Sequence, residues 1–179
     1  MNVNEVSLQS GKQRMIFRQG GSTTPDQPLV MEATYQPGGV YPPAHIHPSQ
    51  DEHFELLQGA MSVRMAGREQ VYTAGQCFDV PRGTPHTMRN SGDEDAVMIW
   101  EVRPALKTRT FYETLAALEA DGKTRANGQP YLLQLAVLLR EYRGEFVPVV
   151  AAPLRWLVVN VLAPIGRWRG YTGRYEPRA

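Results

Sequence analysis

Turn residues recur every few positions between residues 14 and 102, and this spacing restricts the fold more than any other feature of the chain. Pairs such as Gln58-Gly59, Ala66-Gly67 and Ala74-Gly75 separate short runs of β-branched, aromatic and other apolar residues. Because such spacing leaves no room for crossover helices, the runs should pair as antiparallel strands. The predicted strands are residues 14–18, 29–35, 53–57, 61–65, 69–73, 77–80, 86–89 and 96–102.

Beyond these strands the apolar residues recur with helical periodicity. Thr110 and Glu113 have the spacing of a capping box, which predicts a helix that begins there and ends at Asp121-Gly122. A second helix is predicted to begin at Pro130, a favoured first-turn residue, and to end at Gly144.

A third apolar stretch, residues 153–165, is interrupted by Pro164 and is too short and too polar for a membrane span. We expect a helix here that packs on the barrel or is shared in a dimer. Residues 140–179 hold seven Arg against three Glu, and Trp156 and Trp168 lie among them. An interfacial contact of this C-terminal segment with a membrane is the alternative, but packing is favoured.

The composition bounds the class of protein. A chain of 179 residues fits one domain with an appendage, which we divide into an N-terminal arm (1–13), an all-β barrel (14–104) and an α-helical extension (105–179). A net charge of +1 and the lack of helix-turn-helix or zinc-finger patterns argue against nucleic acid as a partner. Because Cys77 is the only cysteine and residues 1–20 are too polar for a signal peptide, we expect a cytoplasmic protein. Cys77 lies in a predicted strand and is expected to be a buried structural thiol.

Three of the four histidines lie in two short segments that can converge on one point. Residues two apart on a strand project from the same face, so His45 and His47 can both point into one cavity. A turn over residues 48–51 can bring Glu52 back beside these imidazoles, and His86 would complete the set from a separate strand. Three imidazoles and one carboxylate suit a single divalent ion of Fe, Mn, Ni, Co, Cu or Zn, and they leave coordination positions open for substrate, water or dioxygen.

The spacing around these residues resembles the two sequence motifs of the cupin superfamily. Residues 39–59 match the first motif, which reads glycine, five residues, His-x-His, four residues, Glu, six residues, glycine. Residues 75–90 match the second motif at every fixed position, including Pro81, Gly83 and Asn90. The resemblance implies a cupin jelly-roll barrel, also called a double-stranded β-helix, to which the helical extension is added. It also carries the family's metal ligands over to His45, His47, Glu52 and His86.

Alternate residues of the other strands are expected to form a mostly apolar wall around the metal. The predicted wall residues are Tyr35, Tyr41, Phe54, Phe78, Met88, Met98 and Trp100. Such a pocket would suit a small organic molecule with an apolar or aromatic part, and Tyr41 and Arg64 are candidates for polar contacts with it. His53 follows Glu52 on the same strand, so it should face the opposite side and be structural or exposed.

The resemblance to small single-domain cupin dioxygenases implies a metal-dependent oxidoreductase that acts on a small organic molecule. The same ligands would serve a Lewis acid, so isomerase, lyase or polyketide-cyclase chemistry stays open. Neither motif offers an additional general base, which favours these mechanisms over acid-base sugar epimerisation. A non-catalytic module that binds a small ligand is the alternative from another class. The extension is expected to cover an exposed edge of the barrel or to build a homodimer.

Overall fold

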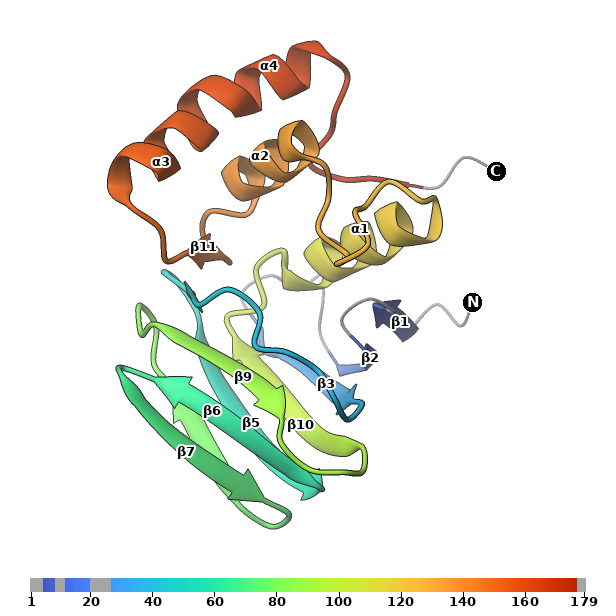
Figure 1. The fold of residues 1–179 in the computed structure, drawn as a ribbon, viewed down its shortest axis with the longest axis vertical. Helices are drawn as coiled ribbons and strands as arrows, with labels where there is room; N and C mark the ends of the chain where they lie inside the picture. Colours follow the sequence, from blue (N-terminus) through green and yellow to red (C-terminus); the bar gives the residue numbers. More distant parts are fainter. Residues whose placement is uncertain (1–4, 9–11, 20–26, 177–179) are drawn as a thin grey trace.

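Two β-sheets form a barrel, and the helices gather on one side of it (Figure 1). This computed structural model describes residues 5–8, 12–19 and 27–176. One sheet has the strand order β1-β2-β3-β10-β5-β8 and the other β11-β4-β9-β6-β7, and the pairings between these strands are antiparallel. The strands are β1 (Glu5–Leu8), β2 (Gln13–Gln19), β3 (Leu29–Tyr35), β4 (His45–Ile46), β5 (Asp51–Gln58), β6 (Ala60–Met65), β7 (Arg68–Thr73), β8 (Cys77–Val80), β9 (His86–Asn90), β10 (Ala96–Arg103) and β11 (Val147–Pro148).

The predicted all-β barrel with a helical extension is confirmed. Each predicted strand is present, and its ends lie within two residues of the expected positions. Three strands were not predicted, namely β1, β4 and β11. Among them, β1 pairs with β2 and so joins the sheet, although it falls in the segment assigned to an N-terminal arm.

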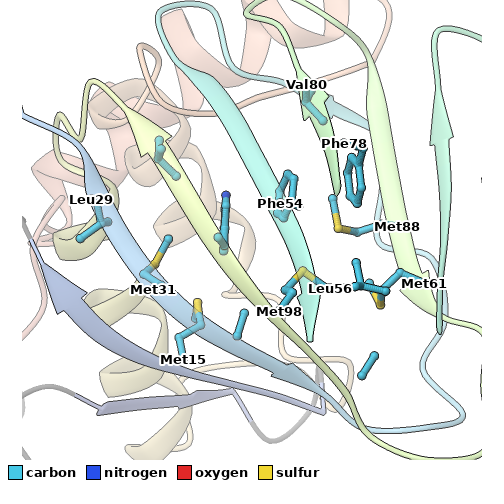
Figure 2. Close-up of a cluster of buried hydrophobic side chains, with 14 of the residues drawn as sticks. Met15, Leu29, Met31, Phe54, Leu56, Met61, Phe78, Val80, Met88 and Met98 are labelled. Atoms are coloured by element: carbon cyan, nitrogen blue, oxygen red, sulfur yellow. The ribbon is translucent and has the colours of Figure 1, made fainter. Parts of the chain in front are cut away.

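Alternate residues of the strands fill the core between the two sheets. Phe54 of β5 is 1% exposed and stacks on Phe78 of β8, with ring centroids 4.8 Å apart. Figure 2 shows these two rings side by side, with Met88 and Leu56 close to them. Because this part of the interior is packed with large side chains, any site for a ligand must lie elsewhere in the barrel.

The same alternation corrects the expectation for Cys77. In β8 the side chains of Phe78 and Val80 are buried, whereas Cys77 is exposed. Successive side chains of a strand face opposite sides, so a strand that points its phenylalanine inwards must point the neighbouring cysteine outwards. The prediction of a strand was correct, but the prediction of a buried thiol was wrong.

The first two helices begin and end close to the predicted positions, but α1 is not capped as predicted. Helix α1 (Thr108–Ala120) begins two residues before Thr110, and no side chain of its own caps it. Instead the backbone N–H of Lys107, its N-cap residue, donates a hydrogen bond of 3.0 Å to the Glu145 carboxylate. A residue from a distant segment thus replaces the local capping box. Helix α2 (Leu132–Glu141) follows the expected Pro130.

The last three helical segments form one continuous helix on the outside of the molecule. They are α3 (Ala152–Leu157), the π-helical turn η1 (Val158–Leu162) and α4 (Ala163–Trp168). Pro164 does not end the helix, because the backbone continues through it, and the π-helical turn η1 lies directly before it as a local irregularity. The helix packs on α2, not directly on the barrel, and Figure 1 shows α2 between the two.

The extension does cover one edge of the barrel. Strand β11 pairs with β4 at the edge of the five-stranded sheet. The pairing is flanked by two further backbone hydrogen bonds, from Ser49 to the Gly144 carbonyl (3.3 Å) and from Val149 to the Ala44 carbonyl (2.9 Å). We call residues 144–149 the strap, because they lie across the segment that contains His45 and His47.

Candidate metal centre

Four short pieces of backbone position the predicted ligands at the junction of the two sheets. His45 of β4 and His86 of β9 are direct cross-strand partners. His47 follows immediately after β4, and its carbonyl accepts a hydrogen bond from Gly83 N–H (2.9 Å). Glu52 is the second residue of β5, in the other sheet, where it lies opposite Val80. The barrel therefore holds the set through its strand pairings and not through one flexible loop.

The structure brings all four residues together. One ligand atom from each of His45, His47 and His86 lies within 4.8 Å of the others. The Oε2 atom of Glu52 lies 3.3 Å from His47 Nε2 and 3.2 Å from His86 Nε2. His53, by contrast, is exposed and lies 2.7 Å from Asp79 through its Nδ1, as its predicted position on the opposite face of β5 requires.

Each of the three histidines has a backbone carbonyl beside its Nδ1 atom. The carbonyls belong to Pro43 for His45 (3.4 Å), to Glu145 for His47 and to Thr84 for His86 (3.1 Å). A carbonyl oxygen can only accept, so each Nδ1 must carry the proton. Each neutral ring then has its free lone pair on Nε2, and this is the tautomer that a metal-binding imidazole needs.

Two atoms of the centre are buried without a hydrogen-bond partner, namely His47 Nε2 and Glu52 Oε2. Glu52 is only 2% exposed, and its other oxygen accepts a hydrogen bond from Trp100 Nε1 (3.1 Å). An unpaired buried polar atom costs about 1–3 kcal/mol, so two of them side by side need an explanation. A cation between them would satisfy both, and the donor set of three imidazoles and one carboxylate fits a divalent transition metal.

Comparison with known families supports the same assignment. Residues 31–102 match the family model for the cupin domain, and this stretch holds all four candidate ligands. Residues 31–102 of the chain are a cupin domain. Its histidine cluster is one that can bind a metal ion.

Individual cupin relatives are distant and match only part of this chain. The probable oxidoreductase virH of Hypocrea virens is 29% identical over 136 residues, which is 72% of this chain and 61% of that protein. Oxalate oxidase 1 of Hordeum vulgare is 34% identical over 73 residues, or 36% of each protein. Among solved structures, the cupin domain of Schizosaccharomyces pombe Cnp3 has a TM-score of 0.49 at 16% identity, covering 57% of this chain and 69% of that one. The chain thus spans less than two thirds of the curated relatives.

Burial sets the protonation of the cupin histidines. Burial, helped by the neighbouring imidazoles, lowers the pKa of His45 to about 3. Burial also lowers the pKa of His47, against the opposing charge of Glu52. Burial opposes protonation of His86 too, but the Glu52 carboxylate outweighs it and raises the pKa of His86. His45 and His47 are therefore neutral at physiological pH, whereas Glu52 favours the protonated form of His86, with which a metal would have to compete.

The helical extension contributes residues that the motifs did not reveal. Glu145 supplies the carbonyl next to His47, and the Phe146 ring stacks on the His45 ring with centroids 4.6 Å apart and planes 28° apart. Phe111 of α1 stacks on Phe146 in turn, at 5.8 Å. The cupin motifs end before these residues, and the only sequence signal is the aromatic content of the extension.

Gln50 is a second residue that sequence reasoning missed. It is 1% exposed, and its Nε2 donates to the carbonyls of Pro104 (2.7 Å) and Ala105 (3.0 Å) and lies 2.8 Å from Thr108 Oγ1. Because carbonyls only accept, the orientation of the amide is fixed. Its oxygen, Oε1, is buried without a partner and belongs to a residue that lines the cavity beside the centre.

That cavity is small, at about 10 Å³, which is room for about one water molecule or ion. It is lined by His47, Gln50, Glu52, Trp100, Val102, Thr108, Phe111, Tyr112, Glu145 and Phe146. Of the predicted wall residues, Trp100 lines it. Phe54, Phe78, Met88 and Met98 belong to the packed core, Tyr35 packs against that core, and Tyr41 hydrogen-bonds with Ser62 (2.6 Å) and Glu69 (2.8 Å). The strap and α1 thus supply much of the wall that the sequence analysis had assigned to the barrel.

Proposed function

We propose that this cupin is a metal-dependent oxidoreductase of the dioxygenase type that acts on a small organic molecule at the centre formed by His45, His47, Glu52 and His86. The observation that carries the proposal is the set of three carbonyls beside the three Nδ1 atoms. They place the proton of each neutral imidazole on Nδ1, so that each ring can offer its Nε2 lone pair beside Glu52, whose Oε2 is buried without a hydrogen-bond partner.

The donor set is compatible with Fe, Mn, Ni, Co, Cu or Zn in the divalent state, and four protein ligands leave positions open on an ion that prefers five or six. Such an ion, when bound, would supply redox chemistry with dioxygen or a Lewis acid for a bound substrate. The buried site favours this chemistry because it holds the carboxylate charge away from water, where its attraction for a cation is strong.

The surrounding residues have three tasks in the proposed reaction. Trp100 holds one oxygen of Glu52 and so aims the other at the histidines. Phe146 covers the His45 imidazole, and Phe111 stacks on Phe146, so that both exclude water. Gln50 offers its amide oxygen as a hydrogen-bond acceptor, which suits a substrate with a hydroxyl or an N–H group. Because the cavity holds about one water molecule, an organic substrate must first displace Phe146 or its neighbours.

Two observations favour oxidoreductase chemistry over an acid-base mechanism. The carboxylate of Glu145, which lines the cavity, is already engaged by the Lys107 N–H, so it is poorly placed to take a proton from substrate. The relatives named above include one called a probable oxidoreductase and one called an oxalate oxidase. Isomerase, lyase and cyclase activities remain the alternatives to be distinguished by experiment.

The test is elemental analysis by mass spectrometry of untagged protein purified without chelator, followed by oxygen-electrode measurements. His86→Ala is the test variant, and His53→Ala is the matched control because His53 is exposed on the opposite face of β5. We expect about one equivalent of a transition metal in the wild type and in the control, and its loss in His86→Ala. Wild type that binds no metal even after reconstitution would refute the centre. Metal-loaded protein that consumes no oxygen with oxalate, catechols or other small hydroxylated compounds would refute the oxidoreductase assignment and leave the centre intact.

A further inference from the structure

In the continuous helix formed by α3, η1 and α4, one face of η1 and α4 is covered by the rest of the protein. That face contacts α2, and on it Ala163 and Gly166 are buried. A Cβ atom on Gly166 would approach the Leu133 carbonyl to 2.8 Å, so the two helices are in close contact there. Figure 1 shows that nothing of the molecule lies on the outer side of this helix.

The other face of the helix exposes large apolar side chains to solvent. Leu154 (51% exposed), Leu157 (43%), Ile165 (41%) and Trp168 (82%) are joined by the half-buried Val161, and their spacing of three and four residues aligns them in one stripe. We call these five residues the apolar stripe. Exposed apolar residues scattered singly are ordinary, but a contiguous stripe on an outermost helix marks a contact surface.

The charged residues of this helix and of the segments that directly flank it have one sign. Between Phe146 and Tyr175 the sequence holds four arginines, at positions 155, 167, 169 and 174, and no aspartate or glutamate. Arg167 pairs with Glu141 (2.7 Å) and Arg174 with Glu176 (3.0 Å). Within the part of the chain that the structure describes, Arg155 and Arg169 form no ion pair.

This charge pattern distinguishes between the possible occupants of the stripe. A second copy of the chain, related by a two-fold axis through the stripe, would bring arginines against arginines, which opposes association. An anionic lipid surface would instead attract the arginines, while the leucine, isoleucine and tryptophan side chains enter the interface between headgroups and acyl chains. No helix of the described residues is long and apolar enough to cross a bilayer, so the helix would lie parallel to the membrane surface.

We propose that the helix formed by α3, η1 and α4 is a docking surface for an anionic lipid bilayer. Each arginine near such a surface strengthens binding by about fivefold at physiological salt. Arg155 and Arg169 together therefore account for about 25-fold. The proposal does not depend on the metal centre, and it replaces the interpretation in which this helix packs on the barrel or joins two copies.

The experiment uses the full chain with large unilamellar vesicles of phosphatidylcholine, with or without one quarter phosphatidylglycerol. The exposed Trp156 and Trp168 serve as probes, because Trp100 is 4% exposed and its emission should stay constant. We expect flotation with the anionic vesicles, a blue shift of tryptophan emission, and loss of both as salt is raised. Neutral vesicles should bind at least tenfold more weakly.

Two variants and one matched control separate the contributions. Leu154→Ser with Trp168→Ser removes exposed apolar side chains from the stripe, and Arg155→Gln with Arg169→Gln removes the unpaired charges. Both should weaken binding to the anionic vesicles by 10-fold or more without lowering the unfolding temperature, because all four side chains are exposed. Val71→Ser, at a 52% exposed position on β7, should bind as the wild type does.

Three outcomes would overturn the proposal. The first is no flotation of the wild type with anionic vesicles at low salt. The second is binding that Val71→Ser weakens as much as the stripe variant does. The third is a wild-type dimer in sedimentation equilibrium that the stripe variant converts to a monomer, because then a second copy covers the stripe.

Discussion

Replacing Phe146 by alanine tests whether the strap is part of the metal centre. The half-buried Phe146 ring stacks on His45 at 4.6 Å and on Phe111 at 5.8 Å. Removal of a fully buried phenylalanine costs about 3–5 kcal/mol, and for a half-buried ring we take about half, or about 2 kcal/mol. Two aromatic contacts worth about 0.5–1.5 kcal/mol each give the same magnitude.

For a domain of this size, such a loss lowers the unfolding temperature by about 4–8 °C. We expect this shift in metal-free Phe146→Ala by circular dichroism, together with release of metal to a chelator at least about tenfold faster, because a group that orients a ligand has been lost. Val150→Ala, a change at a 40% exposed residue just after the strap, is the control and should shift stability by less than about 0.5 kcal/mol. Phe146→Ala that matches this control in both measurements would refute the packing of the strap on His45.

Three further predictions concern the barrel and the support of the centre. Gly59 and Gly67 both have positive φ, but only at Gly59 would a Cβ meet backbone atoms closer than 3.0 Å. In urea titrations Gly67→Ala should lower the free energy of unfolding by about 1–2 kcal/mol, and Gly59→Ala should lower it further. Hydrogen bonds from Lys107 and Arg167 lower the pKa of Glu141. Its contribution to the free energy of unfolding is therefore present above its unfolded pKa of about 4.3 and is lost as the pH falls through the folded pKa. Glu141→Gln should therefore be less stable than wild type at pH 7, and thermal unfolding should show the difference shrinking as the pH falls below about 4.3 and vanishing below the folded pKa. Trp100→Phe removes the hydrogen bond to Glu52 and should weaken metal binding roughly 10- to 100-fold in a chelator competition.

The strands of the barrel were predictable because each is a local pattern between turn residues. β4 and β11 were not, since each has only two residues and is defined by pairing with strands that are distant in the sequence. The capping of α1 failed for the same reason, because the group that caps it is Glu145, far away in the sequence. A tertiary contact with Glu145 thus determines where α1 begins, and the capping-box spacing of Thr110 and Glu113 does not.

The grouping of the four candidate ligands was predictable because the motif spacing reflects the strand geometry directly. The wall of the cavity was not, because alternation identifies which residues of a strand point inwards but not how far along the barrel the core is filled. Phe54 and Phe78 face inwards as expected, yet they stack on each other in the core. The exposure of Cys77 could have been predicted from the same alternation, because Phe78 and Val80 are the apolar residues of this strand and Cys77 lies on the opposite face.

The position of the strap in the chain has a consequence for the order in which the site is assembled. His86, the last candidate ligand, precedes Val149 by 149 − 86 = 63 residues. At a synthesis rate of about 5–20 residues per second, the four side chains are made roughly 3–13 s before the segment that closes over them. During this time the three imidazoles of a nascent chain are not covered by the strap and are accessible to ions in solution. Synthesis of Glu145 and Phe146 ends this period. If the centre binds a metal as proposed, timing during translation as well as affinity would decide which ion it takes.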